Sequence, residues 1–283
     1  MTSPSETTGT GAVYSPAGRF AASGLFAFSR VCVPLLIAVV WFANDPPVTP
    51  PVLLLLFAIF IALPALTLWT WQRAAASTWC VGRDRIVLDE RRRVVEIPTS
   101  AIAEVRPWRI PLPAPGLTLH TRSGRRFAVE DPRAELLDAL RSADLPASRP
   151  VGETTLAVYA RARRVAPRRR WYHRLGKFPA FALLPTAPLF NVHQFIAYGG
   201  PLGEYYLLGA RAYATTFASY WSGVTIYLIL FASIGRAFAE AAALGSAYFD
   251  PDSAATARAR AERAATIFYY AGVPVILAVR FLP

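Results

Sequence analysis

The chain has 283 residues, of which 54% are hydrophobic and only 17% are charged, against about 25% charged residues in ordinary soluble domains. Its mean hydropathy is +0.33 and its formal net charge is +12. These values exclude a fully disordered chain, a collagen-like chain and a small disulfide scaffold. Long apolar runs alternate with arginine-rich stretches, and this segregation indicates an α-helical polytopic membrane protein.

The first 23 residues are rich in Ser, Thr, Gly and Pro, and their only charged side chains are Glu6 and Arg19. A segment of this composition buries too little apolar surface to offset the entropy of ordering it. It also lacks the basic n-region of a signal peptide. We therefore expect residues 1–23 to be a disordered cytoplasmic tail.

Five apolar stretches are long enough to cross a bilayer, which needs about 20 helical residues. Two of them form a transmembrane hairpin within residues 24–71, and three lie within residues 178–283; the spans are 25–43, 51–71, 178–198, 213–233 and 264–283. The third stretch is the weakest because it contains three prolines and several polar side chains. If it does not cross, four helices remain and the C-terminus lies inside.

The charges give an orientation. Between Gln72 and Lys177 there are 22 basic and 11 acidic residues. Loops rich in Lys and Arg stay on the cytoplasmic side, so we expect a multi-pass protein of the bacterial inner membrane with its N-terminus in the cytoplasm. Because topology explains the positive charge, nucleic acid is not expected as a partner. Cys32 and Cys80 form no metal or disulfide motif, and we expect free thiols.

Between residues 76 and 143 the apolar period changes from helical to alternating, which is typical of short strands. Ser123 and Gly124 fit a hairpin turn. Asp131 and Pro132 are expected to begin a helix as its N-cap and first residue, with Leu136, Leu137 and Leu140 on one face. The predicted strands are 79–81, 85–88, 94–97, 102–105 and 117–121, with a return strand at Phe127 and Val129.

This pattern resembles the bacterial pleckstrin-homology domain of small bacterial membrane proteins. The resemblance is carried by the hairpin DRIVL to VEIP, by GLTLHTRSGRR and by the closing DP and leucines. It implies a small inserted antiparallel β domain with a C-terminal helix, which acts as a binding or assembly module and not as an enzyme. The four prolines of Pro107–Pro115 interrupt the pattern, and one strand of the family's sheet is not found in it.

Residues 144–177 form a basic juxtamembrane linker. Clusters of four to eight basic residues beside a span attract anionic lipid, so this segment is a candidate contact with the inner leaflet. The alternative is that its charges only hold the segment inside the cell. The candidate residues are Arg161, Arg163, Arg164, Arg168, Arg169, Arg170, Trp171, Arg174 and Lys177.

The most unusual polar run adjoins the third span. Polar groups at membrane depth are costly and are functional candidates by default, which singles out Asn191, His193, Gln194 and Glu204. His193 and Glu204 are candidates to pair across the turn or to relay protons. Alternatively, the run is a wet structural turn near the outer surface. One histidine is poor support for a haem or metal site, and no metal or cofactor is expected.

Thr215, Ser219 and Gly223 recur at every fourth position of the fourth span and form a stripe of small residues that lets helices approach closely. Motifs of hydrolases, nucleotide-binding proteins and zinc proteases are missing from the sequence. The expected function is therefore a non-enzymatic scaffold, accessory subunit or assembly factor with a membrane protein partner or a second copy of itself. A small channel or transporter that uses His193 and Glu204 is the alternative, and a membrane enzyme is a third.

Overall fold

A computed structural model describes residues 7–42, 48–90, 93–143, 154–165, 171–272 and 274–275. The chain divides into two compact units. We call the first the sheet unit, made of Met1–Ser29, Leu63–Ala166 and Glu240–Ala259. We call the second the helical unit, made of Arg30–Ala62, Pro167–Ala239 and Arg260–Pro283.

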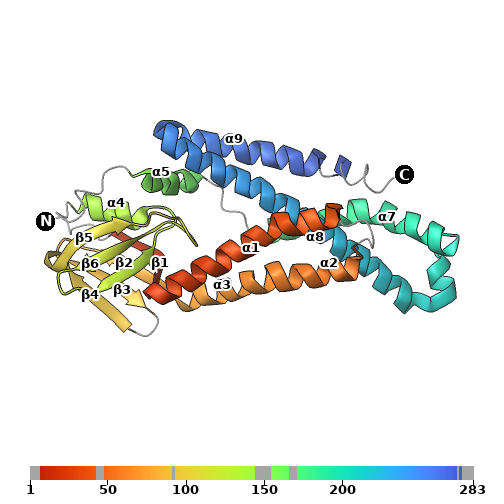
Figure 1. The fold of residues 1–283 in the computed structure, drawn as a ribbon, viewed down its shortest axis with the longest axis horizontal. Coiled ribbons are helices and arrows are strands. Elements are labelled where there is room, and N and C mark those ends of the chain that lie inside the picture. Colours follow the sequence, from red (N-terminus) through yellow and green to blue (C-terminus); the bar gives the residue numbers. More distant parts are fainter. Residues whose placement is uncertain are drawn as a thin grey trace. The chain divides into compact units, whose positions relative to one another are not determined.

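The sheet unit is built on seven antiparallel strands in the order β4-β3-β2-β1-β7-β6-β5 (Figure 1). The two edge strands follow each other in the chain and are joined by only three residues, Thr99–Ala101. The sheet must therefore curve so that its edges approach each other at this connection. The strands are Thr7–Tyr14 (β1), Ala76–Val81 (β2), Arg85–Glu90 (β3), Arg93–Pro98 (β4), Ile102–Pro107 (β5), Gly116–Thr121 (β6) and Arg126–Glu130 (β7).

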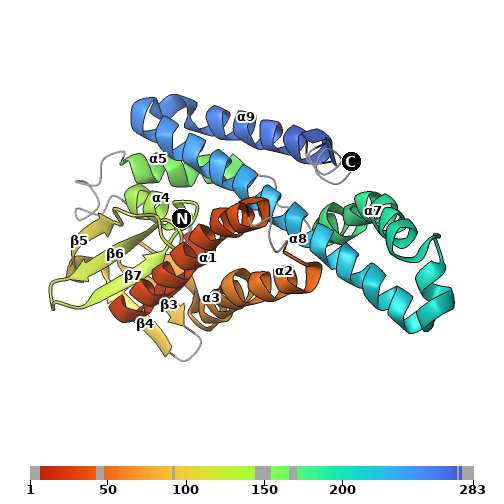
Figure 2. The same cartoon turned by 45° about the vertical axis from the view of Figure 1, so that its right-hand side comes forward.

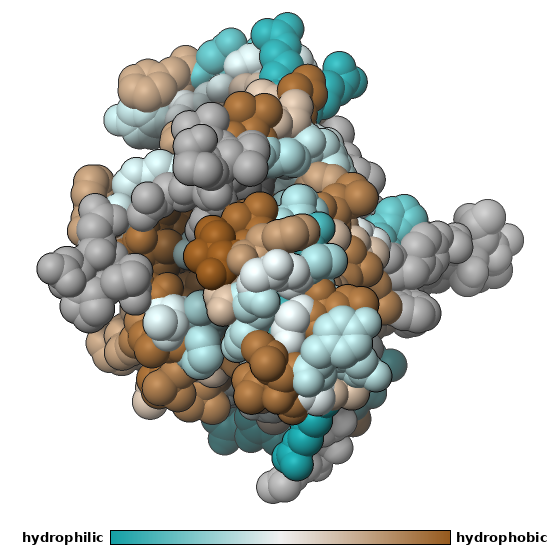
Figure 3. Space-filling view, turned by 90° about the vertical axis from the view of Figure 1, so that its right-hand side faces the viewer, coloured by the Kyte–Doolittle hydropathy of each residue, from teal (hydrophilic) through white to brown (hydrophobic). Residues whose placement is uncertain are grey.

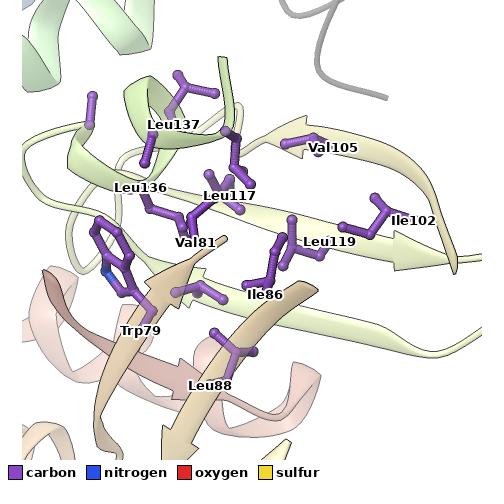
Figure 4. Close-up of a cluster of buried hydrophobic side chains, with 14 of the residues drawn as sticks. Trp79, Val81, Ile86, Leu88, Ile102, Val105, Leu117, Leu119, Leu136 and Leu137 are labelled. Atoms are coloured by element: carbon purple, nitrogen blue, oxygen red, sulfur yellow. The ribbon is translucent and has the colours of Figure 1, made fainter. Parts of the chain in front are cut away.

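The alternating sequence pattern predicts six of these strands. In β6, for example, Leu117 and Leu119 are buried while Thr118 and His120, which alternate with them, are less so, because successive side chains of a strand point to opposite faces. Gly124 turns the chain between β6 and β7 with a φ of +83°, which glycine adopts readily. The inward side chains meet around Trp79, Ile86 and Leu88 in one apolar core (Figure 4).

The expectation of a disordered tail over residues 1–23 is wrong from residue 7 onward, and residues 1–6 lie outside the described part of the chain. Residues Thr7–Tyr14 form β1 in the middle of the sheet, between β2 and β7, and helix α1 begins at Pro16. The segment has almost no apolar alternation of its own. It folds because its partners are distant in the sequence: Gly9 pairs with Trp79, and Val13 pairs with Val129.

The expectation of a small inserted β domain is also wrong, because the sheet includes a segment that is distant in the sequence. The sheet has seven strands and takes its central one from the N-terminus, ahead of the first apolar helix. It also carries two helices, α4 (Glu135–Ser142) and α5 (Thr155–Ala162), which lie side by side in both ribbon views (Figures 1 and 2). Leucines of α4 and alanines of α5 complete the core of the sheet.

Helix α4 begins at Glu135, three residues later than the sequence predicts. Ala134 precedes it in a left-handed conformation, with a φ of 56°. Asp131 nevertheless caps the helix, because its carboxylate accepts hydrogen bonds from the backbone N–H groups of Glu135 at 2.8 Å and Leu137 at 3.0 Å. The predicted side chain therefore caps the helix, but the N-cap position belongs to Ala134 and Pro132 is not the first helical residue.

Four helices are long and apolar enough to cross a membrane, and the protein is a membrane protein. They are Pro16–Phe42 (α1), Pro50–Ala74, His173–Tyr198 and Gly203–Phe249 (α8). The second comprises α2 (Pro50–Phe57), a π-helical turn Ala58–Ala62 and α3 (Leu63–Ala74). The third joins α6 (Trp171–Leu175), a π-helical turn Gly176–Ala180 and α7 (Phe181–Tyr198). Apolar side chains also lie on the surface of the molecule, as brown residues in Figure 3 show.

The expected count of five helices is corrected to four in the described part of the chain. The third span, expected to be the weakest, is one of the four. The fifth expected span, 264–283, begins within α9 (Ala254–Ile267) and a π-helical turn, Phe268–Gly272, and most of its remainder lies outside the described residues. Within the helical unit, Cys32 and Leu36 of α1 pack with Leu53 of α2 and with Ile226 and Leu230 of α8.

Candidate functional site

A buried polar cluster joins the end of α7 to the start of α8. The side chain of Gln194 donates to Glu204 Oε2 at 2.6 Å, and its Oε1 accepts the backbone N–H of Glu204 at 3.2 Å. Thr216 donates its hydroxyl to Glu204 Oε1 at 2.6 Å. Gln194 is 0% exposed and Glu204 is 2% exposed. The cluster therefore satisfies both carboxylate oxygens in an apolar setting, where an unpaired one would be costly.

Gln194 and Glu204, two of the residues that the sequence singles out, bind each other, whereas the expected pairing of His193 with Glu204 is not found among the described residues. Glu204 is held by Gln194 and Thr216, whereas the ring of His193 lies 5.0 Å from that of Tyr220 and 6.1 Å from that of Tyr198. Asn191 is exposed. Among the described residues, no group of three or more His, Cys, Asp or Glu side chains is suited to hold a metal ion.

The cluster sits beside a break in α8. Gly209 has a φ of 86° and a ψ of 172°, which is outside the helical range, and such backbone is strained for residues with a Cβ. Thr216, seven residues beyond the break, reaches back to Glu204 before it. The three side chains thus connect both sides of the break and the preceding helix. Thr216 cannot be singled out from the sequence, because serine and threonine are frequent along this helix.

Three of the basic residues expected to contact lipid bind carboxylates of the sheet unit. Arg161 and Arg164 each form an ion pair with Asp138, at 2.7 Å and 2.6 Å, and Arg163 lies 3.8 Å from Glu240. The two arginines lower the pKa of Asp138 by hydrogen bonding and charge, although its partial burial acts in the opposite direction. These arginines fasten α5 and the turn after it to α4 and α8.

The other candidates in the basic segment fall into two groups. Arg168, Arg169 and Arg170 lie outside the described residues. Trp171 is the first residue of α6, and Arg174 in the same helix is exposed. The ammonium group of Lys177 lies 4.2 Å from the centre of the Tyr269 ring, a cation–π contact.

Glu240 near the end of α8 is the centre of a second polar cluster, which the sequence does not reveal. It accepts the hydroxyl of Tyr159 at 2.7 Å and a guanidinium N–H of Arg258 at 2.9 Å. Burial and the bond to Glu240 raise the pKa of Tyr159 to about 12. Three separate segments, α5, α8 and α9, meet at this carboxylate, and they lie side by side in Figure 2.

Two consecutive acids, Glu130 and Asp131, are buried in the sheet unit. Glu130 accepts the hydroxyl of Tyr14 at 2.8 Å, which ties β7 to β1. Burial raises the pKa of Glu130, and it raises that of Asp131 although backbone N–H groups lower it. Burial and the neighbouring Glu130 likewise raise the pKa of Tyr14.

The buried Glu130 predicts a specific pH dependence. A group whose pKa is raised in the folded state contributes most stability below its ordinary pKa, and that contribution falls as the pH rises through the folded-state pKa. Glu130→Gln keeps an acceptor for Tyr14 but cannot ionise. We expect this variant to be more stable than the wild type near pH 7, and the difference to vanish as the pH falls toward about 4.

Thermal unfolding in detergent at a series of pH values measures this difference. Asp131 and Asp138 titrate in both proteins, so their contributions cancel in the comparison. A difference that stays constant from neutral to acid pH would show that the Glu130 carboxylate is not desolvated in the folded protein.

The sheet unit also contains a small cavity beside Asp131. Its volume is about 20 Å³, which is room for a single water molecule. Its walls come from the β5–β6 connection, α4 and α5, with Pro107, Pro115, Leu117, Asp131, Leu137 and Ala160 among the lining residues. A cavity of this size fits a structural water and not an organic ligand.

Gly223, one residue of the small-residue stripe in α8, lies close to another helix. Gly223 is buried, and a Cβ there would lie 3.5 Å from Cβ of Pro50, the first residue of α2. The hydroxyls of Thr215 and Ser219 instead bond to carbonyl oxygens of α8 itself, at 2.8 and 2.9 Å.

A scan of the chain against protein-family models finds no match, and a search of curated proteins finds no significant similarity.

Proposed function

We propose that this is a non-enzymatic membrane protein that serves as a scaffold, accessory subunit or assembly factor and holds a protein partner at the membrane surface through its sheet unit. One observation carries the proposal: two neighbouring central strands run almost directly into two apolar helices. β1 ends at Tyr14 and α1 begins at Pro16, while α3 ends at Ala74 and β2 begins at Ala76.

These junctions are held by hydrogen bonds. The backbone N–H of Val13 donates to the carbonyl of Ala75 at 3.0 Å, and the N–H of Ala75 donates to the carbonyl of Trp71 at 2.9 Å. Connections of a single residue leave no flexible linker, whose length would let a tethered domain sample many orientations. A sheet attached in this way presents its surface at a fixed height and angle, which suits assembly of a complex.

The location proposed for the protein is the bacterial inner membrane, with the N-terminus and the sheet unit in the cytoplasm. The concentration of arginine between Gln72 and Lys177 supports this orientation, because basic segments are retained on the cytoplasmic side. The resemblance of residues 76–143 to bacterial pleckstrin-homology domains stays a prediction, and its implied role as an interaction module agrees with the proposal.

Purification from the native membrane in mild detergent, followed by native mass spectrometry, tests the proposed role. We expect a complex of defined stoichiometry that contains the chain together with another membrane polypeptide or a further copy of itself. The same measurement on a protein with a disrupted sheet, such as Gly11→Ala, should show less of the complex. A chain that is monomeric under every mild condition would contradict the proposal.

The second candidate is a small channel or transporter, favoured by the carboxylate of Glu204 between apolar helices and by the break at Gly209. Interrupted helices and buried acids mark many ion pathways. Flux of protons or cations through the purified chain in vesicles, abolished by Glu204→Gln, would support it. The fully bonded carboxylate favours a structural role for Glu204.

A further inference from the structure

The connection between β5 and β6 is a proline-rich loop attached to the start of α1. Residues 108–115 read WRIPLPAP and contain one charged side chain, Arg109. Trp108 anchors the loop: it is 3% exposed, its indole N–H donates to Thr118 Oγ1 at 3.0 Å, and the guanidinium of Arg19 lies 3.9 Å from the centre of its ring. The loop is therefore fixed against α1 and β6.

Its position along α1 places it at the level where the helix becomes apolar. The hydroxyl of Ser23 donates to the carbonyl of Leu112 at 3.0 Å. The apolar run of α1 begins at Leu25 and contains a single charged residue, Arg30. Arg19 lies one helical turn before Ser23, which places it about 6 Å nearer the sheet along the helix axis. The loop therefore contacts α1 from Arg19, through Trp108, to Ser23, through Leu112, just before the apolar run begins.

Tryptophans of α3 lie beside this same part of α1, and they indicate the membrane surface by a separate set of contacts. Trp71 lies beside Gly18 of α1, since a Cβ at Gly18 would be 3.6 Å from the indole of Trp71. Trp69 and Trp71 are exposed, and the guanidinium of Arg73 lies 4.1 Å from the centre of the Trp69 ring. Exposed tryptophan beside arginine at the end of an apolar helix is typical of the membrane–water interface.

We infer that Arg109 and Ile110, at the exposed start of this loop, lie in the headgroup layer of the membrane that α1 and α3 cross. Ile110 is 60% exposed and Arg109 is exposed beside it. An apolar side chain gains free energy by entering the boundary of headgroups and acyl chains, and an adjacent arginine is attracted to anionic lipid. The inference depends on α1 and α3 crossing a membrane and not on the proposed partner.

The chain offers a matched control in Val94 of β4. Val94 is also an apolar residue with 60% exposure, but it pairs with Asp89 and lies next to an ion pair between Arg93 and Glu90. Two equally exposed apolar residues of the sheet unit therefore differ in surroundings. The loop position adjoins an apolar helix, and the strand position adjoins charges that favour water.

The test uses the full-length protein in nanodiscs of phosphatidylcholine and phosphatidylglycerol. Ile110→Cys and Val94→Cys are made separately in a Cys32→Ala, Cys80→Ala background and labelled with the fluorophore NBD. Nitroxide lipids carry their quencher either just below the headgroup or at the chain end. We expect at least about twofold stronger quenching at position 110 than at 94, and more by the shallow quencher than by the deep one.

A second measurement removes any influence of the apolar label. A charged, membrane-impermeant maleimide should modify the unlabelled Ile110→Cys protein several-fold more slowly than the unlabelled Val94→Cys protein in the same nanodiscs. Equal quenching and equal modification rates at the two positions would overturn the inference. The proposed partner role would be unaffected by that result, because the nanodiscs contain only this chain.

Discussion

Gly11→Ala is expected to destabilise the sheet unit by about 1–3 kcal/mol, the cost of overpacking a filled site. A Cβ at this position would lie 2.5 Å from the backbone oxygen of Glu130, which is far inside a normal contact distance. Neither partner can move easily, because Gly11 is paired with Ser77 on one side and Glu130 is buried on the other. The central strand β1 would be pushed away from β7.

Thermal or denaturant unfolding in detergent measures this effect. The matched control is Gly24→Ala in α1, where a Cβ meets no other atom within 4 Å. Alanine is favoured over glycine in a helix by up to about 1 kcal/mol, so the control should be as stable as the wild type or more so. If Gly11→Ala matches the control, β1 does not pack between β2 and β7 as described.

Glu240→Ala is expected to lower the stability by about 3 kcal/mol or more, the cost of breaking a buried ion pair. The substitution removes the carboxylate that binds both Tyr159 and Arg258, and the side chain of Arg258 is only 5% exposed. Breaking a buried ion pair costs more than the pair contributes, because the remaining charge stays out of water. The contact of α5 with α8 and α9 should loosen.

An exposed ion pair provides the comparison. Arg85 and Glu96 also form a 3.0 Å pair, but both side chains are more than half exposed, and such pairs contribute little. Glu96→Ala should therefore leave the unfolding midpoint almost unchanged. Glu240→Gln, which can still accept the hydroxyl of Tyr159, should lie between the wild type and Glu240→Ala. Similar midpoints for Glu240→Ala and Glu96→Ala would exclude a stabilising role for the buried cluster.

The features that the sequence predicts well are those with a local physical signature. Six strands follow from alternation of apolar residues, as at Leu117 and Leu119. The apolar helices follow from composition, because hydrocarbon excludes charge over a stretch long enough to cross it. Gln194 and Glu204 stand out because polar groups are rare among apolar ones. Each of these signals lies within one short segment.

The features that the sequence misses depend on distant partners. Strand β1 has no periodicity, and its glycines make sense only against Trp79 and the backbone of Glu130. The linker arginines looked free to bind lipid, but Asp138 and Glu240, distant in the sequence, bind three of them. A count of charges gives the orientation of a segment but does not identify the partner of each side chain.

The N-terminal strand β1 is the centre of the sheet and joins it directly to α1. Hydrogen–deuterium exchange of the intact protein in nanodiscs tests this claim directly. We predict that the amides of Thr7–Tyr14 are protected together with those of β2 and β7, because Thr7–Ala12 pair with β2 and Val13 and Tyr14 pair with β7. Rapid exchange across these residues, with β2 and β7 still protected, would contradict the account.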